Sequence, residues 1–149
     1  PVLVRKDLPG FLANRMQHAL AREAFALIDA GVASPEDVDA AVRFGFGFRF
    51  LAAGPVLQRD HAGLEVHCAA AATMYPSLAA NKEPGRCLAQ KVAEGKLGMK
   101  TGEGFFAWTE QSMAKERQRY QKTLLAGLQI LKAELPPVGD ADIARKETI

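Results

Sequence analysis

Asn14 is the first residue of this sequence whose type and place suggest chemistry. It falls in the first turns of a helix that the apolar spacing predicts over residues 10–30, directly after a corner made by Pro9 and Gly10. An asparagine near a helix start commonly bonds the local backbone or is exposed to solvent. A catalytic or substrate-binding amide is the alternative, and position alone leaves both interpretations open.

Glu23 is a second candidate, because it lies inside the apolar stripe of the same predicted helix. A carboxylate at such a position must be paired, hydrogen-bonded or neutral. In the simpler interpretation the helix is rolled so that Glu23 reaches water or meets an arginine such as Arg15 or Arg49. In the alternative, Glu23 braces a loop near an active site.

A segment rich in glycine and phenylalanine follows the second predicted helix, with the sequence Gly45-Phe46-Gly47-Phe48-Arg49-Phe50. It is no dinucleotide-binding fingerprint, because Phe50 stands where that motif needs a glycine and the segment follows a helix instead of a strand. The phenylalanines predict a packed corner of the core. The alternative is that they wall a binding channel.

A second glycine-rich segment spans residues 95–104 and contains Lys96 and Lys100, which invites comparison with a phosphate-binding loop. Its spacing is not that of a P-loop, no strand precedes it and no helix starts at Thr101. We interpret it as a shaped loop whose glycines take unusual backbone angles. Such a loop would close three aromatic side chains over the core (Phe105, Phe106 and Trp108).

The remaining polar residues carry weaker indications. His61 and His67 do not share a helix face, and no acidic or cysteine set stands at ligand spacing, so no metal site is predicted. Cys68 and Cys87 are expected to be reduced thiols, which favours a cytoplasmic protein. A net charge of +2 is too small to indicate nucleic-acid binding, and no apolar run reaches membrane-spanning length.

The elements that would carry these residues are almost all helical. At 149 residues the chain is long enough for one domain with its own core. Ser34 is the predicted N-cap of the second helix, and the last helix has a narrow apolar stripe. A short strand over residues 1–6 has no predicted partner. The helices are expected over residues 10–30, 35–44, 55–75, 84–94 and 110–135, followed by a polar tail over residues 136–149.

Two motifs resemble the C-terminal domain of the 3-hydroxyacyl-CoA dehydrogenase family. The first, which is similar to the segment that joins the family's dinucleotide-binding domain to its helical domain, is Pro9-Gly10-Phe11-Leu12-Ala13-Asn14-Arg15. The second, which looks like the family's G-x-L-G-x-K-T-G-x-G-F-aromatic motif, is Gly95-Lys96-Leu97-Gly98-Met99-Lys100-Thr101-Gly102-Glu103-Gly104-Phe105-Phe106. The resemblance covers residues 1–108. It implies an all-α fold like the C-terminal domain of 6-phosphogluconate dehydrogenase, preceded by one leftover strand.

The resemblance also implies a division of the parent protein. Residues 1–9 would belong to the edge of a preceding NAD-binding domain, and residues 10–135 would form the substrate-side and dimerisation domain of an enzyme that oxidises (3S)-3-hydroxyacyl-CoA. NAD and the main catalytic base would lie outside this chain, which alone should be inactive. Asn14 would face the cleft near the substrate's 3-oxygen, where an amide can donate and accept hydrogen bonds without changing charge. Phe46 and Phe48 would contact substrate.

Two alternatives remain. The parent protein could oxidise a free 3-hydroxy acid, as carnitine- and gulonate-type relatives do, with Arg49 meeting the substrate carboxylate that a thioester lacks. The chain could instead be a non-catalytic helical assembly module, because its apolar helix faces favour self-association. In the enzyme interpretations the expected partners are an acyl-CoA or hydroxy-acid substrate and a second copy of the chain, with no nucleic acid and no membrane.

Overall fold

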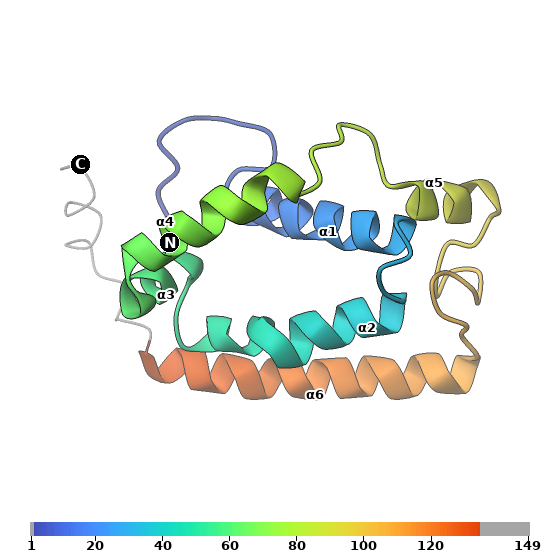
Figure 1. Ribbon diagram of the computed structural model, residues 1–149. Coiled ribbons are helices and arrows are strands. Elements are labelled where there is room, and N and C mark those ends of the chain that lie inside the picture. Colours follow the sequence, from blue (N-terminus) through green and yellow to red (C-terminus); the bar gives the residue numbers. More distant parts are fainter. Residues whose placement is uncertain (1, 135–149) are drawn as a thin grey trace.

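The architecture is helical. The structure, a computed structural model, describes residues 2–134 (Figure 1). Within that range it contains no strand and only isolated β-bridges in the loop before the last helix, so the all-α prediction is confirmed. The elements are α1 (Ala13–Asp29), α2 (Pro35–Ala40), the π-helical turn η1 (Ala41–Phe46), the 3-10 turn η2 (Gly47–Leu51), α3 (Pro55–Ala62), α4 (Leu64–Met74), the 3-10 turn η3 (Tyr75–Ser77), α5 (Arg86–Ala93) and α6 (Glu110–Glu134).

The helices form an open arrangement with an arm (Figure 1). α1 contacts both α5 and α2, while α6 runs as a long rod beside α2, η1 and η2. α3 and α4 pack mainly on each other and form the arm. The body around α1 is therefore the part in which segments far apart in the sequence meet.

Local sequence explains where several helices begin and end. The Ser34 hydroxyl accepts a hydrogen bond from the Asp37 backbone N–H at 3.1 Å, and Pro35 occupies the first helical position. The predicted N-cap of α2 is therefore confirmed. The single helix predicted over residues 55–75 is instead divided into α3 and α4, because Gly63 adopts a φ of +95° between them.

The short strand predicted over residues 1–6 is not formed, since residues 2–6 follow an irregular path. A strand needs a neighbouring strand to take up its backbone N–H and C=O groups. No strand is present in the part of the chain that the structure describes. The predicted polar tail, residues 136–149, lies outside the described residues, as does residue 1.

Few side chains of this fold are fully covered. Ala53 is the only buried hydrophobic residue among residues 2–134, and large apolar side chains are exposed on η1, η2, α3, α4 and α6. None of the helices in that range is long and apolar enough by itself to cross a membrane, although the bent pair Pro35–Leu51 and Pro55–Ala62, at 88°, matches such a span in length and composition. The chain alone thus leaves much apolar surface uncovered.

Candidate functional site

Asn14 is positioned by a strained corner at the start of α1. Gly10 has a φ of +80° and Phe11 a φ of +45°, a backbone conformation that costs a non-glycine residue about 1–2 kcal/mol. Two backbone hydrogen bonds hold the turn: the Phe11 N–H donates to the Leu8 carbonyl at 3.0 Å, and the Arg15 N–H donates to the Gly10 carbonyl at 3.3 Å. The corner therefore fixes where α1 begins and which way Asn14, its second residue, faces.

Asn14 opens onto a groove of about 850 Å³. One wall is formed by α1, and the facing wall is the segment 81–85 that precedes α5. A cavity of this size is typical of sites for small organic ligands. The side chains that α1 contributes to the groove include Asn14, Arg15, His18, Arg22 and Phe25.

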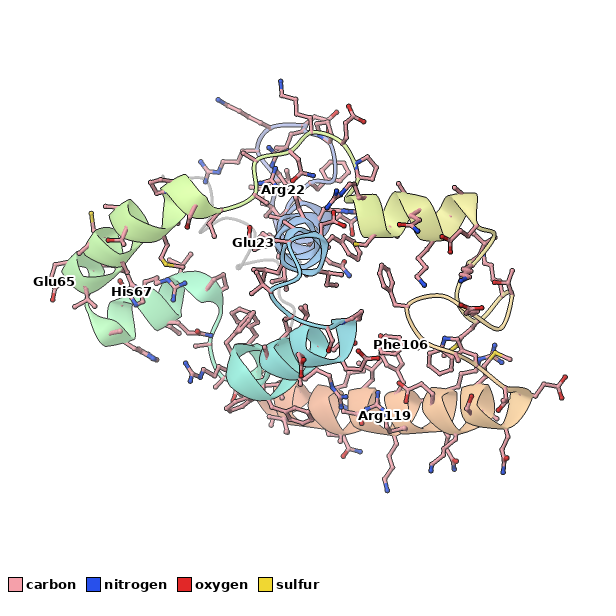
Figure 2. The ribbon with its side chains drawn as sticks, turned by 45° about the vertical axis from the view of Figure 1, so that its right-hand side comes forward. Arg22, Glu23, Glu65, His67, Phe106 and Arg119 are labelled. Atoms are coloured by element: carbon pink, nitrogen blue, oxygen red, sulfur yellow. The ribbon has the colours of Figure 1, made fainter. Side chains whose placement is uncertain are left out.

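Glu23 anchors the chain that leads into the facing wall. Its Oε2 accepts a hydrogen bond from the Ala79 backbone N–H at 2.7 Å, across 56 residues of sequence. Glu23 is partly exposed to solvent, as the simpler expectation allowed, but the expected pairing with Arg15 or Arg49 is not formed, and its contact with Ala79 is that of a loop brace. Glu23 and Arg22 leave α1 on two different sides (Figure 2), so the brace and the groove use separate faces of the helix.

Asp29 anchors the other end of the facing wall. Its Oδ2 accepts from the Arg86 backbone N–H and its Oδ1 from the Cys87 backbone N–H, each at 2.7 Å. α1 thus supplies the cap that α5 lacks, because Gly85 at the N-cap position has no side chain. Desolvation alone would raise the pKa of Asp29, but the backbone donors prevail and hold that pKa below its usual value. Burial and the neighbouring carboxylate raise the pKa of the Cys87 thiol.

Phe25 connects the groove to an apolar cavity of about 290 Å³ on another side of α1. There the ring of Phe105 stacks on Phe25 with centroids 5.7 Å apart, and Phe106 meets Trp108 edge to face at 6.3 Å. Of the three aromatic side chains predicted to close over the core, Phe105 packs on α1 and Phe106 lines the same apolar cavity, whereas among the described residues Trp108 makes its ring contact with Phe106 only. The segment after the glycine-rich loop therefore packs on α1 at the apolar cavity, on a different side of the helix from the groove.

The 95–104 loop keeps its shape through its own contacts. Lys96 forms ion pairs with Glu103 at 3.0 Å and Glu94 at 3.2 Å, and the hydrogen bonds to these two carboxylates raise the pKa of Lys96. Lys96 is therefore engaged within the loop and not presented to a phosphate. As predicted, three of the loop's glycines have positive φ (Gly95, Gly98 and Gly102).

The structure does not bring Phe46, Phe48 or Arg49 to the groove of Asn14. They lie on η1 and η2, and none of them lines the groove. Phe46 is 37% exposed and Phe48 57% exposed, so the packed corner expected for this segment is wrong for the described chain. The physical reason is that these rings have no covering surface among the described residues: Phe46 packs edge to face on Phe50 at 6.0 Å, and Phe50 is itself 45% exposed.

Sequence reasoning missed three basic residues of the groove, His18, Arg22 and Lys82. Asn14, His18 and Arg22 are spaced by four residues, which places them in one row along a helix. That spacing is a signal that the sequence contains. Lys82 has no such signal, because only the fold brings it opposite α1.

No metal centre accompanies the groove. Among residues 2–134 no group of three or more histidine, cysteine or acidic side chains is placed to hold a metal ion. His67 and Glu65 belong to the arm, on α4 (Figure 2), and do not line the groove. Cys68 and Cys87 are both free thiols.

Residues 10–108 match the family model described as "3-hydroxyacyl-CoA dehydrogenase, C-terminal domain". The matched range begins at the corner before Asn14 and ends at Trp108, after the glycine-rich loop. It therefore contains both anchors of the groove, Glu23 and Asp29, and the wall that they hold.

Several individual proteins are similar to this chain. The 5-formyl-3-hydroxy-2-methylpyridine 4-carboxylate 5-dehydrogenase of Mesorhizobium japonicum is 38% identical over 133 residues, which cover 89% of this chain and 43% of that protein. A crystal structure of a 5-dehydrogenase for the same compound, described as an NAD+ dependent dismutase, matches with a TM-score of 0.86 and 34% identity, over 89% of this chain and 43% of that one.

Two further relatives match shorter stretches. The human mitochondrial hydroxyacyl-coenzyme A dehydrogenase is 37% identical over 105 residues, which cover 69% of this chain and 32% of that protein. The L-carnitine dehydrogenase of Burkholderia mallei is 48% identical over 65 residues, which cover 44% of this chain and 20% of that protein. The chain thus spans less than half the length of each of these relatives.

Proposed function

The chain belongs to the 3-hydroxyacyl-CoA dehydrogenase family, as its C-terminal domain, and from this premise we propose that it is the substrate-side and dimerisation domain of an NAD-dependent dehydrogenase. One observation carries the proposal. Asn14, in the motif where the family match begins, opens onto a groove large enough for a small organic substrate.

NAD is assigned to a preceding domain of the parent protein, because the residues described here do not fit it. A dinucleotide site of the usual kind needs a strand, a glycine-rich turn and a helix in succession. Residues 2–134 contain no strand, and the 45–50 segment follows a helix. We therefore expect this chain alone to bind no NAD and to be inactive as a dehydrogenase.

Asn14 serves the reaction by orienting the substrate's reacting oxygen. Its amide N–H donates a hydrogen bond to the oxygen on the carbon that is oxidised, while its carbonyl accepts one from the acid–base group of the parent protein. A neutral amide does both without competing for the proton. The strained corner at Gly10 and Phe11 holds the amide in place before substrate arrives.

The substrate is either a 3-hydroxyacyl-CoA or a free hydroxy acid. The family name and the human relative favour the thioester. A free acid is favoured by the Mesorhizobium relative, whose name contains a carboxylate and which matches 89% of this chain. Arg49 was the expected partner for such a carboxylate, but it lies on η2, outside the groove.

Replacement of Asn14 tests the proposed function. In the parent protein with its NAD-binding domain, we expect Asn14→Ala to lower kcat by about 100-fold, the usual loss for one donor to a developing oxyanion. Gln17→Ala is the matched control, because it removes an amide from the same helix but lines the apolar cavity and not the groove. Unchanged turnover of NAD by Asn14→Ala would refute the role of Asn14, and turnover by the 149-residue chain alone would refute the division between domains.

We also propose that the exposed apolar faces are covered by a second copy of the chain. Among residues 2–134, large apolar side chains are exposed on η1, η2, α3, α4 and α6. Exposed apolar surface beyond the scattered single residues of a monomer marks an interaction site. On α6, Tyr120, Leu124 and Leu128 remain 49–59% exposed although they form one stripe.

Sedimentation equilibrium of the 149-residue chain tests this proposal. We expect twice the mass of one chain, and a shift toward the single-chain mass in Leu124→Glu, which places a charge on the α6 stripe. Gln121→Glu adds the same charge to a neighbouring face of α6 and should leave the dimer intact. A chain that sediments at its own mass would contradict the dimer.

The location in the cell is proposed to be cytoplasmic. The basis is that Cys68 and Cys87 are free thiols, as expected in a reducing compartment. The human relative is named as a mitochondrial protein, so the alternative location is the mitochondrion, and a localisation experiment would distinguish the two.

A further inference from the structure

Four basic side chains share the groove with Asn14. Arg15, His18 and Arg22 line it from α1, and Lys82 lines it from the facing wall. Asn14, His18 and Arg22 follow one another at four-residue intervals, so they form a row along the helix, with Arg15 beside it. Arg22 projects from α1 away from the side that carries the Glu23 brace (Figure 2). The groove therefore has one wall that combines an amide with two arginines and a histidine.

These basic groups have no protein partner in the described chain. None of them takes part in the ion pairs found among residues 2–134, which belong to Lys96 and Arg119. Glu83 is the single carboxylate among the groove's lining residues. The acidic residues of α1, Glu23 and Asp29, stand at no three- or four-residue spacing from the row, and they are bonded to the backbone N–H groups of Ala79, Arg86 and Cys87. A positive groove without counter-charge favours an anionic ligand.

The spacing of the row limits how far the anionic group lies from the reacting carbon. With a rise of about 1.5 Å per residue, His18 is about 6 Å and Arg22 about 12 Å along the helix axis from Asn14. Arginine and lysine side chains are long and can reach back toward Asn14. A carboxylate on the same small molecule as the reacting hydroxyl falls in this range, whereas the phosphates of coenzyme A are separated from the acyl group by the whole pantetheine arm.

We propose that Arg15, His18, Arg22 and Lys82 bind the carboxylate of a small substrate whose reacting carbon faces Asn14. The planar guanidinium of Arg22 can donate two parallel hydrogen bonds to a carboxylate, and Lys82 supplies a point charge from the opposite wall. The proposal rests on the proposed function, because it names the substrate class of the same groove. It assigns carboxylate recognition to α1 and the 81–85 segment instead of Arg49.

A binding experiment on the full 149-residue chain tests the site without any dehydrogenase assay. Sodium pyridine-4-carboxylate is titrated into the isotope-labelled chain, and the amide resonances are followed by NMR. We expect saturable shifts confined to residues 14–22 and 81–83, and no such shifts with neutral pyridine-4-methanol at the same concentrations. Inorganic pyrophosphate, titrated in parallel, represents the phosphates of coenzyme A or NAD.

Two variants decide whether the named side chains carry the binding. Arg22→Gln should raise the Kd for pyridine-4-carboxylate by about tenfold, the usual effect of losing one charge-assisted pair. Lys82→Gln should weaken binding in the same direction and is the second variant if Arg22→Gln does not fold. Arg117→Gln removes the same charge from α6, outside the groove, and should leave the Kd unchanged.

Four results would overturn the proposal. The first three are the absence of saturable shifts in the groove, equal binding of the neutral analogue, and equal effects of Arg22→Gln and Arg117→Gln. The fourth is pyrophosphate binding more than tenfold tighter than carboxylate binding, since the groove would then serve a phosphate. Failure of this proposal can be told apart from failure of the proposed function. If the chain binds the carboxylate but the parent protein does not turn over NAD, the proposed function is refuted and the anion site stands.

Discussion

The hydrogen bond between Glu23 and Ala79 should decide whether the facing wall of the groove stays closed. We consider Glu23→Ala, which removes the carboxylate that accepts the Ala79 N–H at 2.7 Å. Hydrogen bonds to charged groups contribute about 1.5–3 kcal/mol, and the lower end applies here because both residues are only partly buried. A loss of about 1.5 kcal/mol corresponds to a roughly tenfold shift between closed and open forms of the wall.

Native-state hydrogen exchange reports this shift at the amide concerned. Protection of the Ala79 N–H should fall about tenfold in Glu23→Ala, and the free energy of unfolding in urea should fall by about 1.5 kcal/mol. Glu23→Gln keeps an acceptor oxygen and should lose about half as much. Glu36→Ala, in the first turn of α2, is the control and should leave Ala79 protected. Unchanged exchange at Ala79 in Glu23→Ala would refute the brace.

Two further predictions concern the contact between α1 and α5. Gly85→Ala should lower the free energy of unfolding in denaturant by about 1–3 kcal/mol. The reason is that the new Cβ would sit 2.8 Å from the Phe25 Cβ and 3.2 Å from the Asp29 Oδ2. Gly45→Ala is the control, because a Cβ at that position meets nothing within 4 Å. Because the folded-state pKa of Asp29 lies below its usual 3.8, its contribution to stability is present above that pH and lost as the pH falls through the lowered value. Asp29→Asn should therefore remove part of the acid sensitivity measured by urea unfolding between about pH 5 and pH 3, and an unaltered acid profile would contradict the cap.

Elements that depend on neighbouring residues could be predicted from the sequence. Ser34 and Pro35 announce the start of α2, and the last predicted helix, residues 110–135, corresponds to α6, Glu110–Glu134. The division between α3 and α4 was missed although Gly63 stood in the sequence, because a glycine within a helical pattern does not reveal its φ. Neighbouring residues therefore predict where a helix begins, but they do not predict whether it is interrupted within its length.

Elements that depend on distant residues could not be predicted in the same way. Glu23 was recognised as out of place in its apolar stripe, but its partner Ala79 lies 56 residues away and donates through its backbone, which carries no sequence signal. The exposure of Phe46 and Phe48 was missed for a related reason. Apolar composition predicts burial, yet it does not state whether the covering surface belongs to the same chain.

The distribution of charge on α1 explains how one helix both builds the groove and sets its sign. Its acidic side chains, Glu23 and Asp29, accept hydrogen bonds from the backbone N–H groups of Ala79, Arg86 and Cys87, on either side of the 81–85 wall. Neither carboxylate stands three or four residues from Arg15, His18 or Arg22, so the residues that hold the wall do not neutralise the basic row. The same helix therefore fixes the wall with its acidic residues and supplies positive charge to the groove with its basic ones. Loosening the wall should weaken anion binding, because Lys82 would no longer be held opposite α1.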